Sequence, residues 1–242
     1  MIRTVRHSLS LLLSLAALAL IPAAPTTVNA ADSNARMELP APNKTGGMPL
    51  MQALAQRRSI KTGFSGAALS PQQLSDLLWA TWGVNREDGR RTAPTAMNRQ
   101  DVRLYVALET GVWLYEPADA LVKVLDGDWR AQMGGGSLTL LYAVPQGNEW
   151  GGAHVGSLYQ NAGLFCASAG LGNYVHVSGL HALDGKLPLT EGWKIFIVQT
   201  VGLLKSGFAG HKNESPFFMR RTGIFHVLHT QRCEQKGPLG LE

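Results

Sequence analysis

Residues 137–171 read SLTLLYAVPQGNEWGGAHVGSLYQNAGLFCASAGL, and this stretch decides the fold. Residues 137–144 are an apolar run with glycines before it and Pro145 after it, a pattern that predicts a buried strand. Residues 155–171 carry the small and apolar side chains of an interior helix. A buried strand followed by a buried helix predicts one hydrophobic core built from both kinds of element.

The elements on either side of this stretch set the fold class. They do not alternate between strand and helix as a doubly wound sheet would, so the sequence predicts an α+β protein. Ser70 is an N-cap, Pro71 occupies the first helical position, and Gly83 stops that helix. The remaining expected elements are a short helix running into residues 50–61, a hairpin over 101–115 and a β-rich run over 193–201.

Composition narrows the class of protein. The chain has 242 residues, of which 45% are hydrophobic and 16% charged, enough apolar material for a single domain. The formal charge is +5, but the basic residues are scattered, so nothing in the sequence predicts a nucleic-acid partner. Cys166 and Cys233 are far apart in sequence, which argues against a disulfide framework and against a zinc site.

The first thirty residues have the three parts of a secretory signal. Arg3 and Arg6 precede an apolar run over residues 9–21, and a small-residue stretch ends at Ala30. An uncleaved anchor is the alternative, but the run is shorter than the roughly 20 residues of a spanning helix. We expect a signal peptide over residues 1–30 and an exported, periplasmic protein with no membrane contact after cleavage. Residues 31–49 are expected to form a flexible or extended lead-in.

Several motifs occur together in one order along the chain. They are RRSIK at 57–61, the segments 69–79 and 82–86, RTAPTAMNRQ at 91–100, the segment 155–172 and QTVG at 199–202. Together they resemble the nitroreductase family, especially its subgroup related to thiazoline and oxazoline dehydrogenases, over residues 50–205. The resemblance implies a mixed, largely antiparallel sheet flanked by helices, bound FMN and a homodimer. Residues 206–242 fit the family poorly and are expected to be an extension of uncertain structure.

The resemblance places a flavin phosphate beside a basic segment. Arg57 and Arg58 would supply the planar, paired N–H groups that suit a phosphate, and Ser59 would add a hydroxyl. Lys61 keeps the charge of the family's second arginine position but not its paired geometry, and Lys205 would be the basic residue near the phosphate at the end of the domain. The alternative is that these are ordinary solvated charges at a helix end.

Other residues are expected to lie near the flavin ring. Asn98 stands where the family places an asparagine against the flavin, and Gln100 follows it with a second amide that can both donate and accept. Gly170 and Gly172 would place backbone N–H groups beside the cofactor. The alternatives are that Asn98 and Gln100 stabilise a turn, and that Gly170 ends a helix in the left-handed conformation.

The chemistry is assigned to the flavin, because no catalytic side chain and no metal site stand out. His154, His176 and His181 lie on different elements without an acidic partner at metal-ligand spacing and are predicted to be isolated. We expect an FMN-dependent oxidoreductase that passes hydride or electrons to a small planar acceptor of nitroaromatic or quinone type. The alternative is an exported flavin-binding or substrate-binding protein without turnover. NAD(P)H remains possible as donor, although export makes it doubtful.

Overall fold

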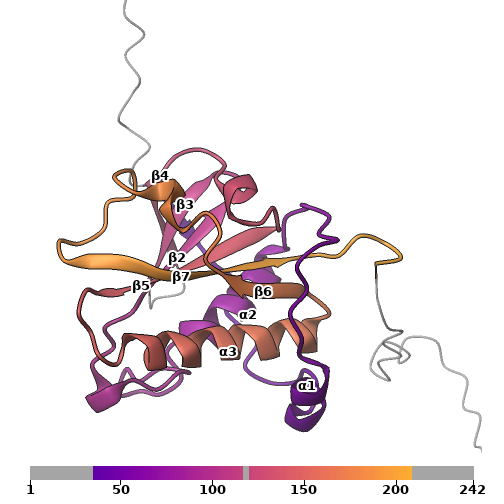
Figure 1. The fold of residues 1–242 in the computed structure, drawn as a ribbon. Helices are drawn as coiled ribbons and strands as arrows, with labels where there is room; N and C mark the ends of the chain where they lie inside the picture. Colours follow the sequence, from indigo (N-terminus) through magenta and orange to yellow (C-terminus); the bar gives the residue numbers. More distant parts are fainter. Residues whose placement is uncertain (1–34, 117–119, 209–242) are drawn as a thin grey trace, which may run out of the picture.

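The computed structural model describes residues 35–116 and 120–208, and their seven strands form one sheet in the order β1-β4-β3-β2-β5-β7-β6 (Figure 1). The strands are β1 (Arg36–Glu38), β2 (Arg103–Leu108), β3 (Gly111–Glu116), β4 (Ala120–Leu125), β5 (Leu138–Pro145), β6 (Gly172–His176) and β7 (Trp193–Gly202). Every pairing among these strands is antiparallel, and the resemblance implied a mixed, largely antiparallel sheet. The α+β class is confirmed.

Strand β5 lies between β2 and β7 and is buried on both faces. Leu140 and Tyr142 belong to the core under the α-helices, and Leu141 and Ala143 belong to a second core on the opposite face. Because both faces are covered, the strand needs apolar side chains at consecutive positions rather than at alternate ones. This explains the continuous apolar run that predicted it.

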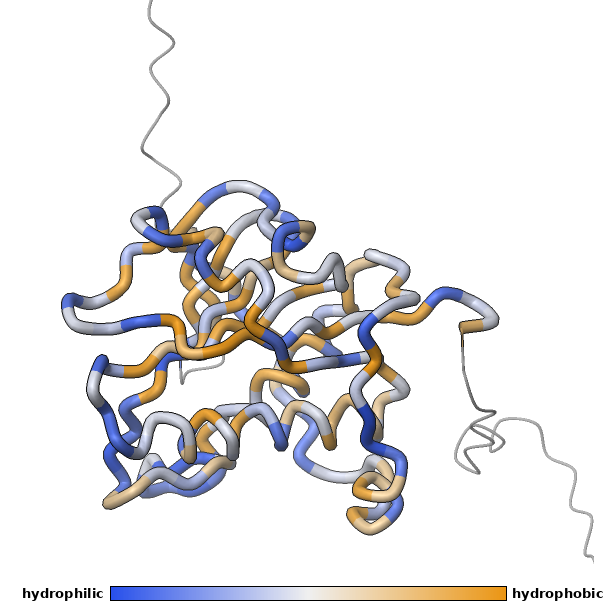
Figure 2. Tube along the Cα trace, in the orientation of Figure 1, coloured by the Kyte–Doolittle hydropathy of each residue, from blue (hydrophilic) through white to orange (hydrophobic). Residues whose placement is uncertain are grey.

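Helices cover the two faces unequally. Figure 1 shows α1 (Leu50–Gln56), α2 (Pro71–Trp82) and α3 (Gly151–Ala169) on one side of the sheet. The opposite face is covered by two short 3₁₀ turns, η3 (Arg130–Met133) and η4 (Leu180–Leu183), which contribute buried side chains to the second core. Figure 2 shows hydrophobic residues concentrated where the sheet meets these coverings.

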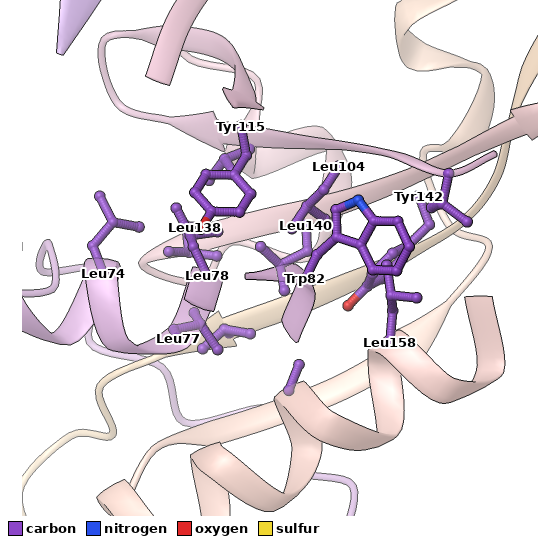
Figure 3. Close-up of a cluster of buried hydrophobic side chains, with 14 of the residues drawn as sticks. Leu74, Leu77, Leu78, Trp82, Leu104, Tyr115, Leu138, Leu140, Tyr142 and Leu158 are labelled. Atoms are coloured by element: carbon purple, nitrogen blue, oxygen red, sulfur yellow. The ribbon is translucent and has the colours of Figure 1, made fainter. Parts of the chain in front are cut away.

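Helix α2 follows its predicted bounds. Ser70 Oγ accepts the N–H of Gln73 at 3.2 Å and Gln73 Oε1 accepts the N–H of Ser70 at 3.0 Å, a capping box that satisfies two donors at the helix start. Figure 3 shows side chains from the buried face of the helix in the core below the sheet, including Leu78 and Trp82.

Helix α3 begins at Gly151, four residues earlier than predicted. Val155, Leu158, Ala162 and Cys166 recur at helical spacing and are buried against the sheet. Figure 3 shows Leu158 and Tyr142 within the same cluster. The helix ends at Gly170, whose φ of 69° is left-handed and whose N–H bonds to Cys166 O.

Several features differ from the sequence prediction. Strands β1, β4 and β6 were not predicted, and α1 ends at Gln56, so residues 57–61 lie outside the helix. The described part of the lead-in is extended, and it is held by β1 and by a 2.7 Å hydrogen bond from Met48 N to Ser168 Oγ. The predicted signal peptide and residues 209–242 lie outside the described residues. Among those described, no helix is long and apolar enough to cross a membrane.

Candidate functional site

The basic segment after α1 is extended and runs beside β6. Arg57 N–H bonds to Ala53 O at 2.8 Å and closes the helix, and Ile60 N–H then bonds to Asn173 O, also at 2.8 Å. Arg57 and Arg58 are exposed, as is Ser59. The backbone bond at Ile60 therefore fixes both arginines at the edge of the sheet where β6 begins.

A second backbone pairing brings the end of the domain to the same edge. Ser65 N–H bonds to Leu203 O at 2.8 Å, and Lys205 N–H bonds to Gly63 O at 2.9 Å. Lys61 lies two residues before Gly63, so the backbone segments that carry Lys61 and Lys205 are neighbours. The structure thus gathers Arg57, Arg58, Ser59, Lys61 and Lys205, which we call the cationic edge.

The charges of the cationic edge are unpaired within the described part of the chain. The side chains of Arg57, Arg58, Lys61 and Lys205 make no hydrogen bond or ion pair there. Arginines elsewhere do have partners: Arg36 lies 2.6 Å from Glu116, and Arg130 lies 2.8 Å from Asp128. Gathered cations without a carboxylate repel one another, and a bound anion would relieve that repulsion. The edge is electrostatically suited to a phosphate.

Gly172 is required by packing at this edge. A Cβ at Gly172 would lie 2.6 Å from Leu204 Cδ2 and 3.0 Å from Phe64 Cε1. Phe64 and Leu204 form the isolated β-bridge between the two segments that carry Lys61 and Lys205. The missing side chain at Gly172 therefore lets that bridge approach β6. Gly170 ends α3 in the left-handed conformation, a role that is compatible with a cofactor nearby, and the contacts of the Gly170 and Gly172 backbone with a flavin stay predictions.

A buried hydrogen-bond chain supports the cationic edge from below. Tyr142 Oη donates to Gln199 Oε1 at 2.6 Å, and Gln199 Nε2 donates to Asn173 Oδ1 at 2.9 Å. Burial raises the pKa of Tyr142 well above its ordinary value, so the phenol stays protonated and donates. Asn173 is the residue whose carbonyl holds Ile60, which links this chain to the basic segment. Sequence reasoning did not assign Asn173 a role; a polar residue at the start of a buried strand was its only signal.

The predicted ring-binding loop follows α2 and is strained. Met97, Asn98 and Gln100 have φ values of 52°, 53° and 50°, in the left-handed region that side chains other than Asn rarely adopt. The short turn η2 (Ala96–Asn98) contains two of them. Asn98 is exposed, and its Nδ2 makes no hydrogen bond with the described residues. An exposed amide donor on a fixed loop is free to meet a ligand.

The side chain of Gln100, by contrast, is hydrogen-bonded through both its oxygen and its nitrogen to other residues of the loop region. Its Oε1 accepts from Arg91 Nε at 2.8 Å, and its Nε2 donates to Gly89 O at 3.2 Å. Arg91 also donates to Trp82 O at 2.7 Å and stacks over the Trp82 ring at 4.5 Å. Burial lowers the pKa of Arg91 from its ordinary value. These contacts give Gln100 the turn-stabilising role; a contact between Gln100 and a flavin stays a prediction.

The prediction that His154 is isolated was wrong. His154 is 3% exposed, its Nδ1 lies 2.8 Å from Asp101 Oδ1, and its Nε2 accepts the N–H of Ala96 at 2.8 Å. The two partners are 53 and 58 residues away in sequence, so local spacing could not reveal them. His181 has an exposed partner, Asp184, at 2.8 Å. Within residues 35–116 and 120–208, no group of His, Cys, Asp or Glu could hold a metal.

A cavity of about 330 Å³ lies elsewhere, between β1, the start of α2 and β5. Leu39, Leu74 and Leu138 are among its apolar lining residues, and Arg130 lies at its wall. None of the predicted site residues lines it. The cavity is therefore separate from both the cationic edge and the loop of Asn98.

The fold and the cationic edge define an α+β protein equipped to hold an anion, and comparison with known proteins identifies its family. The model of the nitroreductase family matches residues 54–203. A structure assigned as a nitroreductase from Ralstonia eutropha JMP134 is 34% identical, with a TM-score of 0.65, and the alignment covers 71% of this chain and 90% of that one. The chain belongs to the nitroreductase family of oxidoreductases.

More distant structures share the fold. One assigned as a nitroreductase from Anabaena variabilis ATCC 29413 is 16% identical, covers 71% of this chain and 42% of that one, and has a TM-score of 0.59. The E. coli microcin synthetase McbBCD complex with truncated pro-MccB17 bound is 18% identical over 70% of this chain and 79% of that one, with a TM-score of 0.51. Comparison with curated proteins gives no match.

Gly172→Ala tests the close packing behind the cationic edge. The added methyl must displace Leu204 or Phe64, and we expect it to lower the free energy of unfolding by about 1 to 3 kcal/mol. The matched control is Gly152→Ala, where the new Cβ would meet only Phe196 Cζ, at an ordinary 3.5 Å. Urea denaturation measures both. Equal stability of Gly172→Ala and the wild type would contradict the packing role of Gly172.

Proposed function

We propose that this chain is an FMN-dependent oxidoreductase that passes hydride or electrons to a small planar acceptor of nitroaromatic or quinone type. The cationic edge carries the proposal, because its unpaired charges meet at one place and suit the terminal phosphate of FMN. Membership of the nitroreductase family supports the same cofactor.

The residues divide the work of binding. Arg57 and Arg58 offer paired N–H donors and Ser59 a hydroxyl to the phosphate. Lys61 adds positive charge from the same segment and Lys205 from the neighbouring one. Asn98 offers its free Nδ2 donor to the polar edge of the ring. FMN supplies the redox chemistry when bound, and the protein binds, orients and tunes it.

Arg58→Ala tests the phosphate contact. Loss of a charge-assisted hydrogen bond should lower FMN affinity on the order of ten- to a hundredfold, and excess FMN should restore much of the rate. Asn98→Ala should instead alter turnover even when FMN is saturating, because its contact is to the ring. A flavin titration beside a turnover assay with an artificial electron donor measures both effects.

Arg36→Ala is the matched control for the loss of charge. Arg36 is also an exposed arginine, but it lies on β1 and is paired with Glu38 and Glu116. FMN affinity in this variant should equal that of the wild type. If Arg58→Ala binds FMN as tightly as Arg36→Ala does, Arg58 does not hold the phosphate. Flavin bound without any turnover would favour the alternative of a binding protein.

The cationic edge and the loop segment that carries Asn98 contact α3 at different positions in one chain. The part of the loop next to Asn98 meets α3 at His154, through the bond from Ala96, while the start of the loop meets it at Asn161, through Thr92 O. A Cβ on Gly163 would lie 3.6 Å from Arg57 Cδ, so the basic segment meets α3 there. His154 and Gly163 are nine residues apart, which is two and a half turns and about 14 Å of helix, so they lie on opposite sides of α3. We infer that a flavin is completed by the cationic edge of one protomer and the loop of its partner in a homodimer.

Mixing two defective variants tests this arrangement. In a mixed dimer of Arg58→Ala and Asn98→Ala chains, a site shared across the interface has both defects once and neither defect once. Refolding the two variants together should therefore recover both wild-type FMN affinity and wild-type turnover in roughly a quarter of the sites, because random pairing makes about half of the dimers mixed. Mixing after folding without subunit exchange is the control. No recovery, or a stable FMN-loaded monomer in sedimentation, would contradict the shared site.

Export remains a proposal based on the leader. Residues 9–21 form its apolar run and Val28, Asn29 and Ala30 its cleavage site. We expect mass spectrometry of protein from the native host to show a chain that begins at Ala31, recovered from the periplasmic fraction. Intact Met1 in the cytoplasmic fraction would overturn the proposal.

A further inference from the structure

The loop of Asn98 is tied to α3 by a hydrogen-bond chain through one buried imidazole. The N–H of Ala96 can only donate, so Nε2 of His154, 2.8 Å away, must carry the lone pair. Nδ1 then carries the proton of the neutral ring and donates it to Asp101 Oδ1 at 2.8 Å. The hydrogen bonds thus select one tautomer of His154, which is 3% exposed.

Asp101 is itself held from two further directions. Its Oδ2 accepts from Asn148 Nδ2 at 3.0 Å and lies 3.1 Å from Arg99 Nε. All the neighbours of this carboxylate are donors, which suits an ionised acceptor in a fixed orientation. The imidazole of His154 therefore joins a fixed carboxylate on one side to a backbone amide on the other.

The two hydrogen bonds of His154, to Ala96 and to Asp101, attach to the chain on either side of the strained residues. Ala96 precedes Met97, Asn98 and Gln100, the three left-handed residues, and Asp101 directly follows them. Residues other than glycine keep a left-handed backbone conformation only where surrounding contacts hold them. Such strain is concentrated at functional sites. A further bond, from Gln100 N to Thr95 Oγ1 at 3.1 Å, lies within the loop and cannot fix it relative to α3. A bond from Asn161 Nδ2 on α3 to Thr92 O, at 3.2 Å, holds only the start of the loop, so the strained residues themselves are fixed against the helix through His154.

We propose that His154 and Asp101 are positioning residues that lock this loop against α3 and so set where Asn98 meets the flavin ring. The inference rests on the proposed function for its flavin part. Because His154 is buried and both its nitrogens are occupied, it does not exchange protons with a substrate. Its effect on turnover passes through the loop.

Substituting His154 by Gln or by Asn separates its bond to Ala96 from its bond to Asp101. In His154→Gln the side-chain oxygen can occupy the place of Nε2 and keep the acceptor for Ala96. In His154→Asn the amide can occupy the place of Nδ1 and keep the donor to Asp101, but the acceptor for Ala96 is lost. Asp101→Asn places an amide N–H group against the donors of Asn148 and Arg99, and should therefore disturb the bond from Nδ1 of His154. His181→Ala is the control, because His181 is exposed and belongs to neither arm.

The first measurement needs no flavin. Amide hydrogen exchange in the protein without FMN should show the Ala96 N–H exchanging about tenfold faster or more in His154→Asn and Asp101→Asn than in the wild type. His154→Gln should retain most of the protection, and His181→Ala all of it. Unchanged protection in His154→Asn would overturn the lock whatever the cofactor is.

The second measurement uses the FMN-loaded protein. At saturating FMN, His154→Asn should shift the flavin reduction potential in the same direction as Asn98→Ala and lower kcat about tenfold, with FMN affinity within a few fold because the cationic edge is intact. His154→Gln should rescue both values. Equal defects in the Gln and Asn variants, or an unshifted potential in His154→Asn, would overturn the proposal. A wild-type protein that binds no FMN would refute the proposed function, while the exchange measurement would still decide the lock.

Discussion

The packing of α3 against the central strands is the constraint on which the rest of the structure depends. Its face of Val155, Leu158, Ala162 and Cys166 is buried on β5 and its neighbours, and so fixes the height and rotation of the helix. The helix then acts as a rigid spacer. The loop of Asn98 is tied to it at His154, and the basic segment lies against it at Gly163. A shift of α3 would move both halves of the proposed flavin site.

The two halves of the site differ in whether their polar side chains have hydrogen-bond partners within the protein. In the loop most side chains have protein partners: Gln100 bonds to Arg91 and Gly89 within the loop, and Asp101 bonds to His154 on α3. At the cationic edge backbone hydrogen bonds hold the segments in place, but the charged side chains have no partners among the described residues. This difference has a physical reason. A loop that presents one amide must be rigid, whereas a phosphate cradle must keep its donors free for the anion.

Sequence reasoning predicted the elements whose signals are local. Ser70, Pro71 and Gly83 mark the ends of α2, and the apolar run of β5 is visible because both faces of that strand are buried. It missed β1, β4 and β6, which are short or lack a strong alternation. Strand β1 is ordered by pairing with the distant β4, β6 pairs with β7 across the intervening turn η4, and β4 pairs with its neighbour β3 as well as with β1. It also extended α1 into residues 57–61, where helical propensity loses to the backbone bond between Ile60 and Asn173.

The sequence by itself determined the family, the α+β class and which residue types could hold a phosphate, because ordered motifs and capping signals are properties of neighbouring residues. Only the tertiary structure decided which of those residues meet. It placed the segment of Lys61 beside that of Lys205 through the bond from Lys205 N–H to Gly63 O, and it engaged Gln100 within its loop. It left the Nδ2 of Asn98 without a partner among the described residues, and gave the buried His154 a carboxylate 53 residues away. Hydrogen bonds between distant segments depend on how the sheet and α3 pack, and no local spacing encodes that packing.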